Sequence, residues 1–207
     1  MLRSMGDAKA RWARVAARIR TVRTLEVTQF EMGPEDYDDD MLEVIDLMGA
    51  SPPPEPILDF FVGVNGLKLM WNGTIDGAPA RGSIHIVSLL QSSLRVPLEE
   101  DGEPLEGVLW TKDMDSRLVK ELKRMAIFEA IAGSRANLTY YADESDARLY
   151  LVDHRIRPLV TDFSTTIDLL DRYAGAAGLR EILTHEDWRE RIERDPVLRR
   201  VGAIGRD

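Results

Sequence analysis

The 207-residue sequence contains no cysteine. Disulfides, thiolate zinc sites, iron–sulfur clusters and cysteine nucleophiles are therefore excluded together. No apolar run approaches the roughly 20 residues that a membrane-spanning helix needs, and the first residues lack the apolar stretch of a secretory signal. We therefore expect a soluble, cytoplasmic protein.

The short motifs of common catalytic sites are also missing. HExxH, GxSxG and a glycine-rich phosphate loop are absent, and His85, His154 and His185 are scattered along the chain. The pair Asp153-His154 is the best candidate for acid–base chemistry, but a turn after a strand explains it equally well. We expect no enzymatic activity, no cofactor and no bound metal.

Basic residues are missing from a long segment near the start of the chain. Residues 1–24 carry seven basic residues and one acid, whereas residues 25–59 carry eleven acids and no basic residue. The whole chain has a formal net charge of −9. This balance argues against nucleic acid as the main partner, except through the basic segment, and favours a basic protein partner.

The basic segment has the pattern of an amphipathic helix. Trp12, Val15, Ile19 and Val22 recur at three- and four-residue spacings, which predicts a helix over residues 7–24 with a cationic outer face. Three interpretations compete. The helix packs on its own domain and is held near the acidic segment by charge, it is an arm that binds a partner, or it binds nucleic acid or an anionic membrane.

The acidic segment predicts a second helix. Pro34 suits its first turn, Gly49 ends it, and Tyr37, Met41, Val44 or Ile45, and Met48 form its expected buried stripe. The acids are either a solvated helix face or a docking surface for a basic partner. The candidate partner-binding residues are Glu35, Asp36, Asp38, Asp39, Asp40, Glu43 and Asp46, together with Trp110 as an aromatic anchor. The alternating acids lack the glycine and the final glutamate of a calcium loop.

The clearest fold signal lies in residues 57–87. A helical apolar pattern over residues 57–64 ends at Asn65-Gly66, and residues 67–71 and 82–87 then read as strands. A proline-rich connector, residues 51–56, precedes this unit. Helix, tight stop and strand pair form a core unit that contains no catalytic pattern.

Downstream, the chain alternates between further strands and helices. Residues 91–107 are polar and predict a surface excursion, residues 113–124 favour a helix, and residues 138–141 and 147–152 favour strands. Residues 125–131 are ambiguous. Asp162 or Ser164 caps a helix that ends at Gly175 and Gly178, and a charge-laced tail helix starts at Thr184, either exposed or contacting a partner. We predict an α+β fold with an antiparallel sheet of at least four strands packed by helices.

These residues resemble the SMI1/KNR4 (SUKH) superfamily. The similarity rests on a proline-rich entry and on the core residues Asn65, Gly66, Leu67, Trp71, Gly82 and Ile84. It continues more weakly through residues 148–153 and 159–175, so that it covers about residues 35–178. The resemblance implies an α+β fold and roles in binding other proteins. Many bacterial members resemble immunity proteins that neutralise toxins, often nucleases and deaminases, and the fungal namesake is a signalling scaffold.

Taken together, the sequence predicts three parts: a basic helical extension (1–24), a SMI1/KNR4-like domain (25–178) and a charged C-terminal helix (179–207). We expect a non-catalytic protein-binding module, an immunity-type or adaptor protein whose partner is another protein, such as a basic toxin domain. The alternative is a structural or adaptor subunit of a larger assembly, attached through the basic N-terminal helix.

Overall fold

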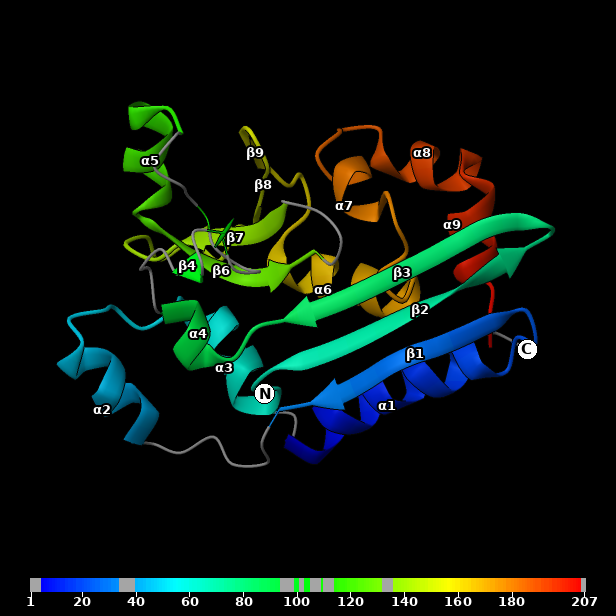
Figure 1. The fold of residues 1–207 in the computed structure, drawn as a ribbon, viewed down its shortest axis with the longest axis horizontal. Coiled ribbons are helices and arrows are strands. Elements are labelled where there is room, and N and C mark those ends of the chain that lie inside the picture. Colours follow the sequence, from blue (N-terminus) through cyan, green and yellow to red (C-terminus); the bar gives the residue numbers. More distant parts are fainter. Residues whose placement is uncertain are drawn as a thin grey trace.

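Over the part of the chain that the structure describes, the fold is an α+β arrangement around a seven-stranded antiparallel sheet, which confirms the predicted class (Figure 1). The computed structural model describes residues 5–33, 40–93, 99–100, 103–104, 109, 114–131 and 136–205. In spatial order, the strands of the sheet are β1 (Leu25–Met32), β2 (Leu67–Ile75), β3 (Ala78–Ile86), β6 (Met125–Ala130), β7 (Asn137–Tyr141), β8 (Tyr150–Val152) and β9 (Ile156–Pro158). A separate pair consists of β4 (Glu99–Glu100) and β5 (Glu103–Pro104). The helices are α1 (Met5–Arg20), α2 (Asp40–Leu47), α3 (Glu55–Gly63), α4 (Leu89–Ser93), α5 (Ser116–Leu122), α6 (Phe163–Arg172), α7 (Leu179–Ile182), α8 (Trp188–Arg194) and α9 (Pro196–Val201).

A long hairpin forms one half of the sheet. Strands β2 and β3 pair from Leu67↔Ile86 to Ile75↔Ala78, and the two residues between them, Asp76 and Gly77, both have positive φ (50° and 82°). Such a two-residue turn matches the right-handed twist of the flanking strands. The strands predicted at residues 67–71 and 82–87 are therefore correct in kind, and both are longer in the structure.

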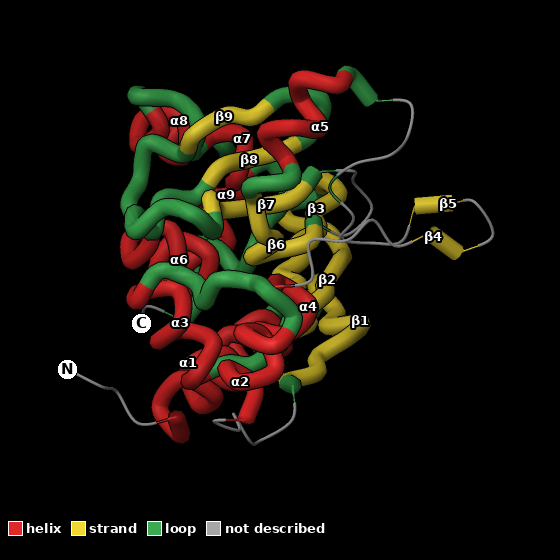
Figure 2. The backbone as a smooth tube through the Cα atoms, turned by 90° about the vertical axis from the view of Figure 1, so that its left-hand side faces the viewer, coloured by secondary structure: helices red, strands yellow, loops and turns green. Residues whose placement is uncertain are grey.

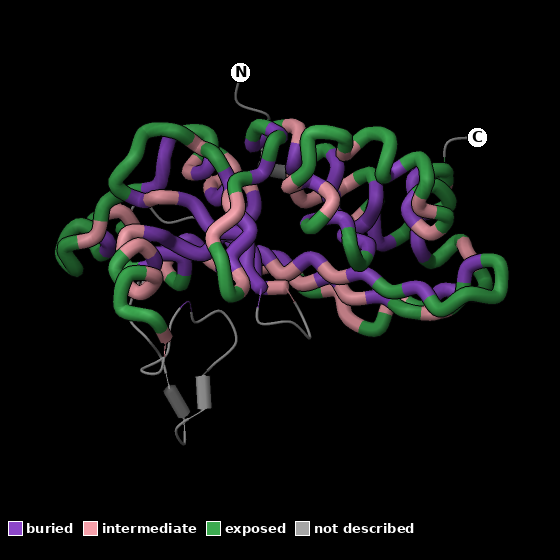
Figure 3. Tube along the Cα trace, turned by 90° about the horizontal axis from the view of Figure 1, so that it is seen from above, coloured by how far each residue is buried: buried purple, intermediate pink, exposed green. Residues whose placement is uncertain are grey.

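Helices α1, α3 and α6 cover one face of this sheet (Figure 2). The buried residues of the strands and helices gather between the two layers (Figure 3). Helix α1 contributes Trp12, Val15, Ala16 and Ile19, each at most 1% exposed. The predicted amphipathic pattern is confirmed. The apolar face of α1 packs in the main hydrophobic core, together with residues of the sheet and of other helices.

The two halves of the sheet meet at a narrow junction. Strands β3 and β6 share one residue pair, Ile86↔Glu129. Farther along, the edge of β3 bonds to a loop, because Ser83 N–H donates to the Gly175 carbonyl (3.0 Å) and Ala177 N–H donates to the Arg81 carbonyl (2.9 Å). The sheet thus divides where residues 175–177 take the place of a neighbouring strand.

A buried ion pair closes this junction. The Arg180 guanidinium donates to both carboxylate oxygens of Glu129, and the two side chains are 3% and 0% exposed. It also donates to the carbonyls of Gly175 (2.7 Å) and Ser83 (2.7 Å). Buried charges persist only when they are paired and hydrogen-bonded, so this arginine fixes β3, β6 and the loop before α7 together.

Several elements differ from the sequence-based prediction. Strand β1 was not predicted, and its pairing with β2 contains an irregularity between Val27 and Gln29 that breaks the two-residue period. The tail forms three short helices rather than one, and the break between α8 and α9 lies at Pro196, which lacks the N–H needed to continue α8. Residues 91–93, expected in a surface excursion, belong to α4, where Ser92 and Ser93 are buried.

Candidate interaction surface

Helix α2 is attached to the core by little of its surface. Ile45 is its buried side chain (1% exposed), while Met41 and Leu42 are half-buried. The Asn65 amide nitrogen lies 3.5 Å from the Met41 sulfur, which joins α2 to the turn before β2. The helix ends at Leu47, and Gly49 adopts a φ of 68°, as predicted for its stop signal.

A second group of apolar side chains on α2 is open to solvent. Leu47 is 86% exposed, Met48 just after the helix is 54% exposed, and Val44 is 39% exposed. Within the described part of the chain, these are three of the four large apolar side chains that are exposed. Leu47 lies two residues after Ile45, hence roughly 200° around the helix axis from it. Helix α2 therefore has one apolar face in the core and another in solvent.

Acidic side chains lie beside the exposed apolar residues. Asp40, Glu43 and Asp46 are exposed on the same helix. The structure thus brings three of the predicted partner-binding residues together with an apolar patch. The remaining ones, Glu35, Asp36, Asp38, Asp39 and Trp110, lie outside the described residues. We call Val44, Leu47, Met48, Glu43 and Asp46 the α2 surface.

The predicted buried stripe of this helix was partly wrong. Ile45 is buried, as the choice of Val44 or Ile45 allowed, but Met48 is exposed, and Tyr37 lies outside the described residues. The sequence carried a usable signal, because six of the eight residues 41–48 are apolar and surround the helix axis. A two-turn helix at the edge of a core cannot bury all of them at once.

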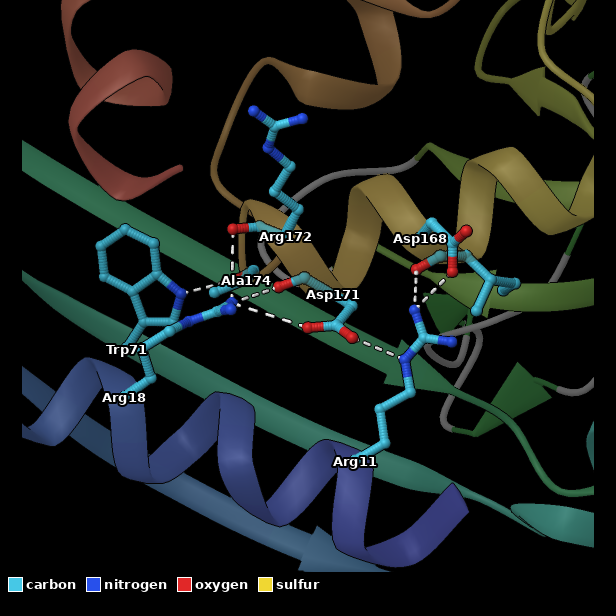
Figure 4. A network of polar contacts seen from close by, with 8 residues as sticks. Arg11, Arg18, Trp71, Asp168, Asp171, Arg172 and Ala174 are labelled. Atoms are coloured by element: carbon cyan, nitrogen blue, oxygen red, sulfur yellow. Dashed lines mark hydrogen bonds and ion pairs between the residues drawn. The ribbon is translucent and has the colours of Figure 1, made fainter. Parts of the chain in front are cut away.

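Two arginines of α1 are bound within the molecule, against another helix. Arg11 pairs with Asp168 (Nη2–Oδ1, 2.7 Å) and Asp171 (Nε–Oδ2, 2.6 Å), both on α6 (Figure 4). Arg18 lies 3.7 Å from the Asp171 carboxylate, and donates to backbone carbonyls at the end of α6. In the part of the chain that the structure describes, these ion pairs join α1 to α6, whereas the interpretation from the sequence placed the partner charges in residues 25–59.

The residues that carry the family resemblance all have structural roles. Asn65 accepts a hydrogen bond from the Leu89 N–H (2.8 Å), and Gly66 (φ 96°) accepts one from the Gly33 N–H (2.7 Å). Leu67 and Ile84 are buried in the core.

Trp71 and Gly82 are fitted to each other across the hairpin. The Trp71 indole N–H donates to the Ala174 carbonyl (2.7 Å) (Figure 4). A Cβ on Gly82 would lie 2.5 Å from the indole ring, so any larger residue would displace the ring. These contacts give Trp71 and Gly82 a role in the scaffold.

The Asp153-His154 pair lies on the turn between β8 and β9. His154 is 72% exposed, with Nδ1 3.3 Å from the Asp153 carboxylate and Nε2 accepting from Arg155. Partial burial raises the pKa of Asp153, but the Arg155 N–H and the Arg157 guanidinium lower it, and the net pKa is below the ordinary value. The Asp153 carboxylate thus accepts hydrogen bonds from Arg157 and from the backbone, and these bonds stabilise the turn.

A shallow cleft of about 520 Å³ lies on another side, beside the start of α6. It contains Val160, the fourth exposed apolar side chain. Its charges are mixed, since Asp146, Arg148 and Asp162 all line it, and Asp162 already caps α6 by accepting from the Thr165 N–H (2.6 Å). The cleft therefore carries charges of both signs, whereas the charged residues of the α2 surface are all acidic.

Within the described residues, no group of three or more acidic or histidine side chains could hold a metal ion. No helix in that part of the chain has the length and apolarity to cross a membrane. Neither a family model, a curated protein nor a solved structure gives a match to this chain. The α2 surface and the sequence resemblance are therefore the two features that bear on function.

Proposed function

We propose that the protein is a non-catalytic binding module, of the immunity or adaptor type, which recognises a basic protein through the α2 surface. One observation carries the proposal: three large apolar side chains are exposed to solvent on and just after α2, beside acidic residues of the same helix. Exposed apolar residues grouped within a polar rim are typical of protein-binding sites.

The charge of the chain supports the choice of a basic partner. The chain has a formal net charge of −9, to which Glu43 and Asp46 contribute, so a cationic partner would be attracted to this face before contact. Such complementarity raises the association rate and sets selectivity, whereas buried apolar anchors supply most of the affinity. The resemblance to the SMI1/KNR4 superfamily points in the same direction, because its members bind other proteins.

The alternative, attachment through α1, is less well supported. Trp12, Val15 and Ile19 are in the core, and Arg11 and Arg18 contact α6. To bind another subunit through its apolar face, α1 would first have to break these contacts with its own chain.

The test is affinity purification of the full chain with mass spectrometry, compared with two double charge reversals. Glu43→Lys with Asp46→Lys changes the α2 surface. Glu181→Lys with Glu193→Lys changes α7 and α8, far from α2 in Figure 1, by the same net charge. We expect specific partners to be lost with the first variant and retained with the second. If the unmodified chain and both variants recovered the same partners, the α2 surface would be excluded as the binding site.

A second measurement separates the two types of module. An immunity protein neutralises its partner, so co-expression should protect cells from the toxicity of the captured protein. An adaptor should join its partner to further proteins without such protection.

A further inference from the structure

The shape of the α2 surface indicates which kind of element covers it. Val44, Leu47 and Met48 follow the i, i+3, i+4 spacing, so they form one ridge along the outside of the helix. Ridges of this kind pack into the grooves between side chains of another helix. A partner strand would instead need an open backbone edge to pair with, and a helix has none to offer.

The acids on α2 indicate which residue types the partner helix carries opposite them. Glu43 and Asp46 are three residues apart and therefore lie on one side of the apolar ridge. A helix packed on the ridge would place its own side chains opposite them at the same one-turn spacing. Lysine or arginine at those positions would be attracted, whereas glutamate or aspartate would be repelled.

Resting on the proposed function, we infer that the partner presents a basic amphipathic helix, which packs its apolar face on Leu47 and its cations on Glu43 and Asp46. A second copy of this chain fits less well, because pairing α2 with α2 would bring like-charged acids together at the same interface. Leu47 is the expected centre of the contact, since it is the most exposed of the three apolar side chains.

The test uses a model probe, so that it does not depend on identifying the partner. The probe is a helical peptide with a leucine face and a lysine face, and its control replaces every lysine by glutamate. Binding to the full chain is measured by fluorescence anisotropy, and the site is mapped by amide chemical shifts. We expect the lysine peptide to bind, with shifts centred on α2, and the glutamate peptide to bind at least tenfold more weakly, an estimate of about 1.4 kcal/mol for the charge contacts.

Two substitutions decide whether Leu47 is the anchor. Leu47→Ala should weaken binding of the lysine peptide about tenfold, because most of a leucine side chain is no longer buried. Val160→Ala, which shortens the exposed apolar residue of the cleft beside α6, should leave the affinity unchanged.

Three outcomes would overturn the inference. The lysine peptide fails to bind, it binds with equal affinity to the Leu47→Ala variant, or light scattering shows a dimer of the unmodified chain that Leu47→Ala dissociates. The last result would assign the surface to a second copy. Each of these leaves the proposed function to be judged by the affinity purification, since a partner lost on charge reversal could still use a different element.

Discussion

Helices α1 and α2 look like counterparts in the sequence and are used in opposite ways by the fold. Both were predicted to be amphipathic, one basic and one acidic, and both were candidates for contacting a partner. Helix α1 buries Trp12, Val15 and Ile19, and two of its arginines, Arg11 and Arg18, pair with α6. Helix α2 buries Ile45 and exposes Leu47. Helical charge alone therefore does not distinguish the two helices, whereas an unburied apolar face beside the charge does.

The largest expected effect is on α1. Trp12→Ala should lower the free energy of unfolding by about 3–5 kcal/mol, since it removes a large side chain from a close-packed core. Urea unfolding followed by circular dichroism measures it. Arg14→Ala, on the exposed side of the same helix, is the matched control and should change the value by less than about 0.5 kcal/mol. A small effect of Trp12→Ala would mean that α1 is an extension after all.

The next largest effect is on the anchor of α2. Ile45→Ala should lower the free energy of unfolding by at most about 2 kcal/mol, because α2 can detach locally while the rest of the core stays folded. Hydrogen exchange should show the amides of α2 losing their protection, with those of α1 unchanged. A global loss equal to that of Trp12→Ala would show that α2 is as integral to the core as α1.

A smaller effect is expected from the ion pairs that hold α1. Asp171→Asn keeps the side-chain size but removes the charge that faces Arg11 and Arg18, and should cost about 1 kcal/mol in low salt. The difference from the unmodified protein should shrink in high salt, because ions screen partly exposed pairs. Asp168→Asn, at a 67% exposed carboxylate, should cost less. Equal costs for the two would indicate that burial of Asp171 adds nothing.

The smallest effect on stability is expected at Leu47. Leu47→Ala should change the free energy of unfolding by less than about 0.5 kcal/mol, since the side chain is already in water in the folded state. Thermal and urea unfolding of the pure protein check this. If Leu47→Ala proved strongly destabilising, Leu47 would be a core residue in solution, and the α2 surface would lose its apolar anchor.

Local patterns were enough to predict much of the scaffold. The Asn65-Gly66 stop, the strands around Trp71 and Ile84, and α6 with its Asp162 cap all depend on neighbours in the sequence. Strand β1 escaped prediction because it is at the edge of the sheet, and because the irregularity after Val27 shifts its alternation.

Long-range contacts could not be predicted in the same way. Glu129 and Arg180 look like ordinary surface charges in the sequence, and only the fold brings them together inside the core. For α2, the periodicity of residues 41–48 fits an inward or an outward apolar face equally well. Which of them is buried depends on how much core surface the fold offers at that place, and a local pattern contains no information about that.

The narrow junction between β3 and β6 has a consequence for synthesis on the ribosome. The edge of β3 is completed by Gly175 and Ala177, and Trp71 finds its hydrogen-bond acceptor at Ala174, 103 residues later. Until that part of the chain has emerged, β3 presents an unpaired edge, a feature that favours pairing with other chains. Arrival of residues 174–180 supplies both the edge partner and the arginine that neutralises Glu129. The edge of β3 is therefore covered only after residues 174–180 have been synthesised.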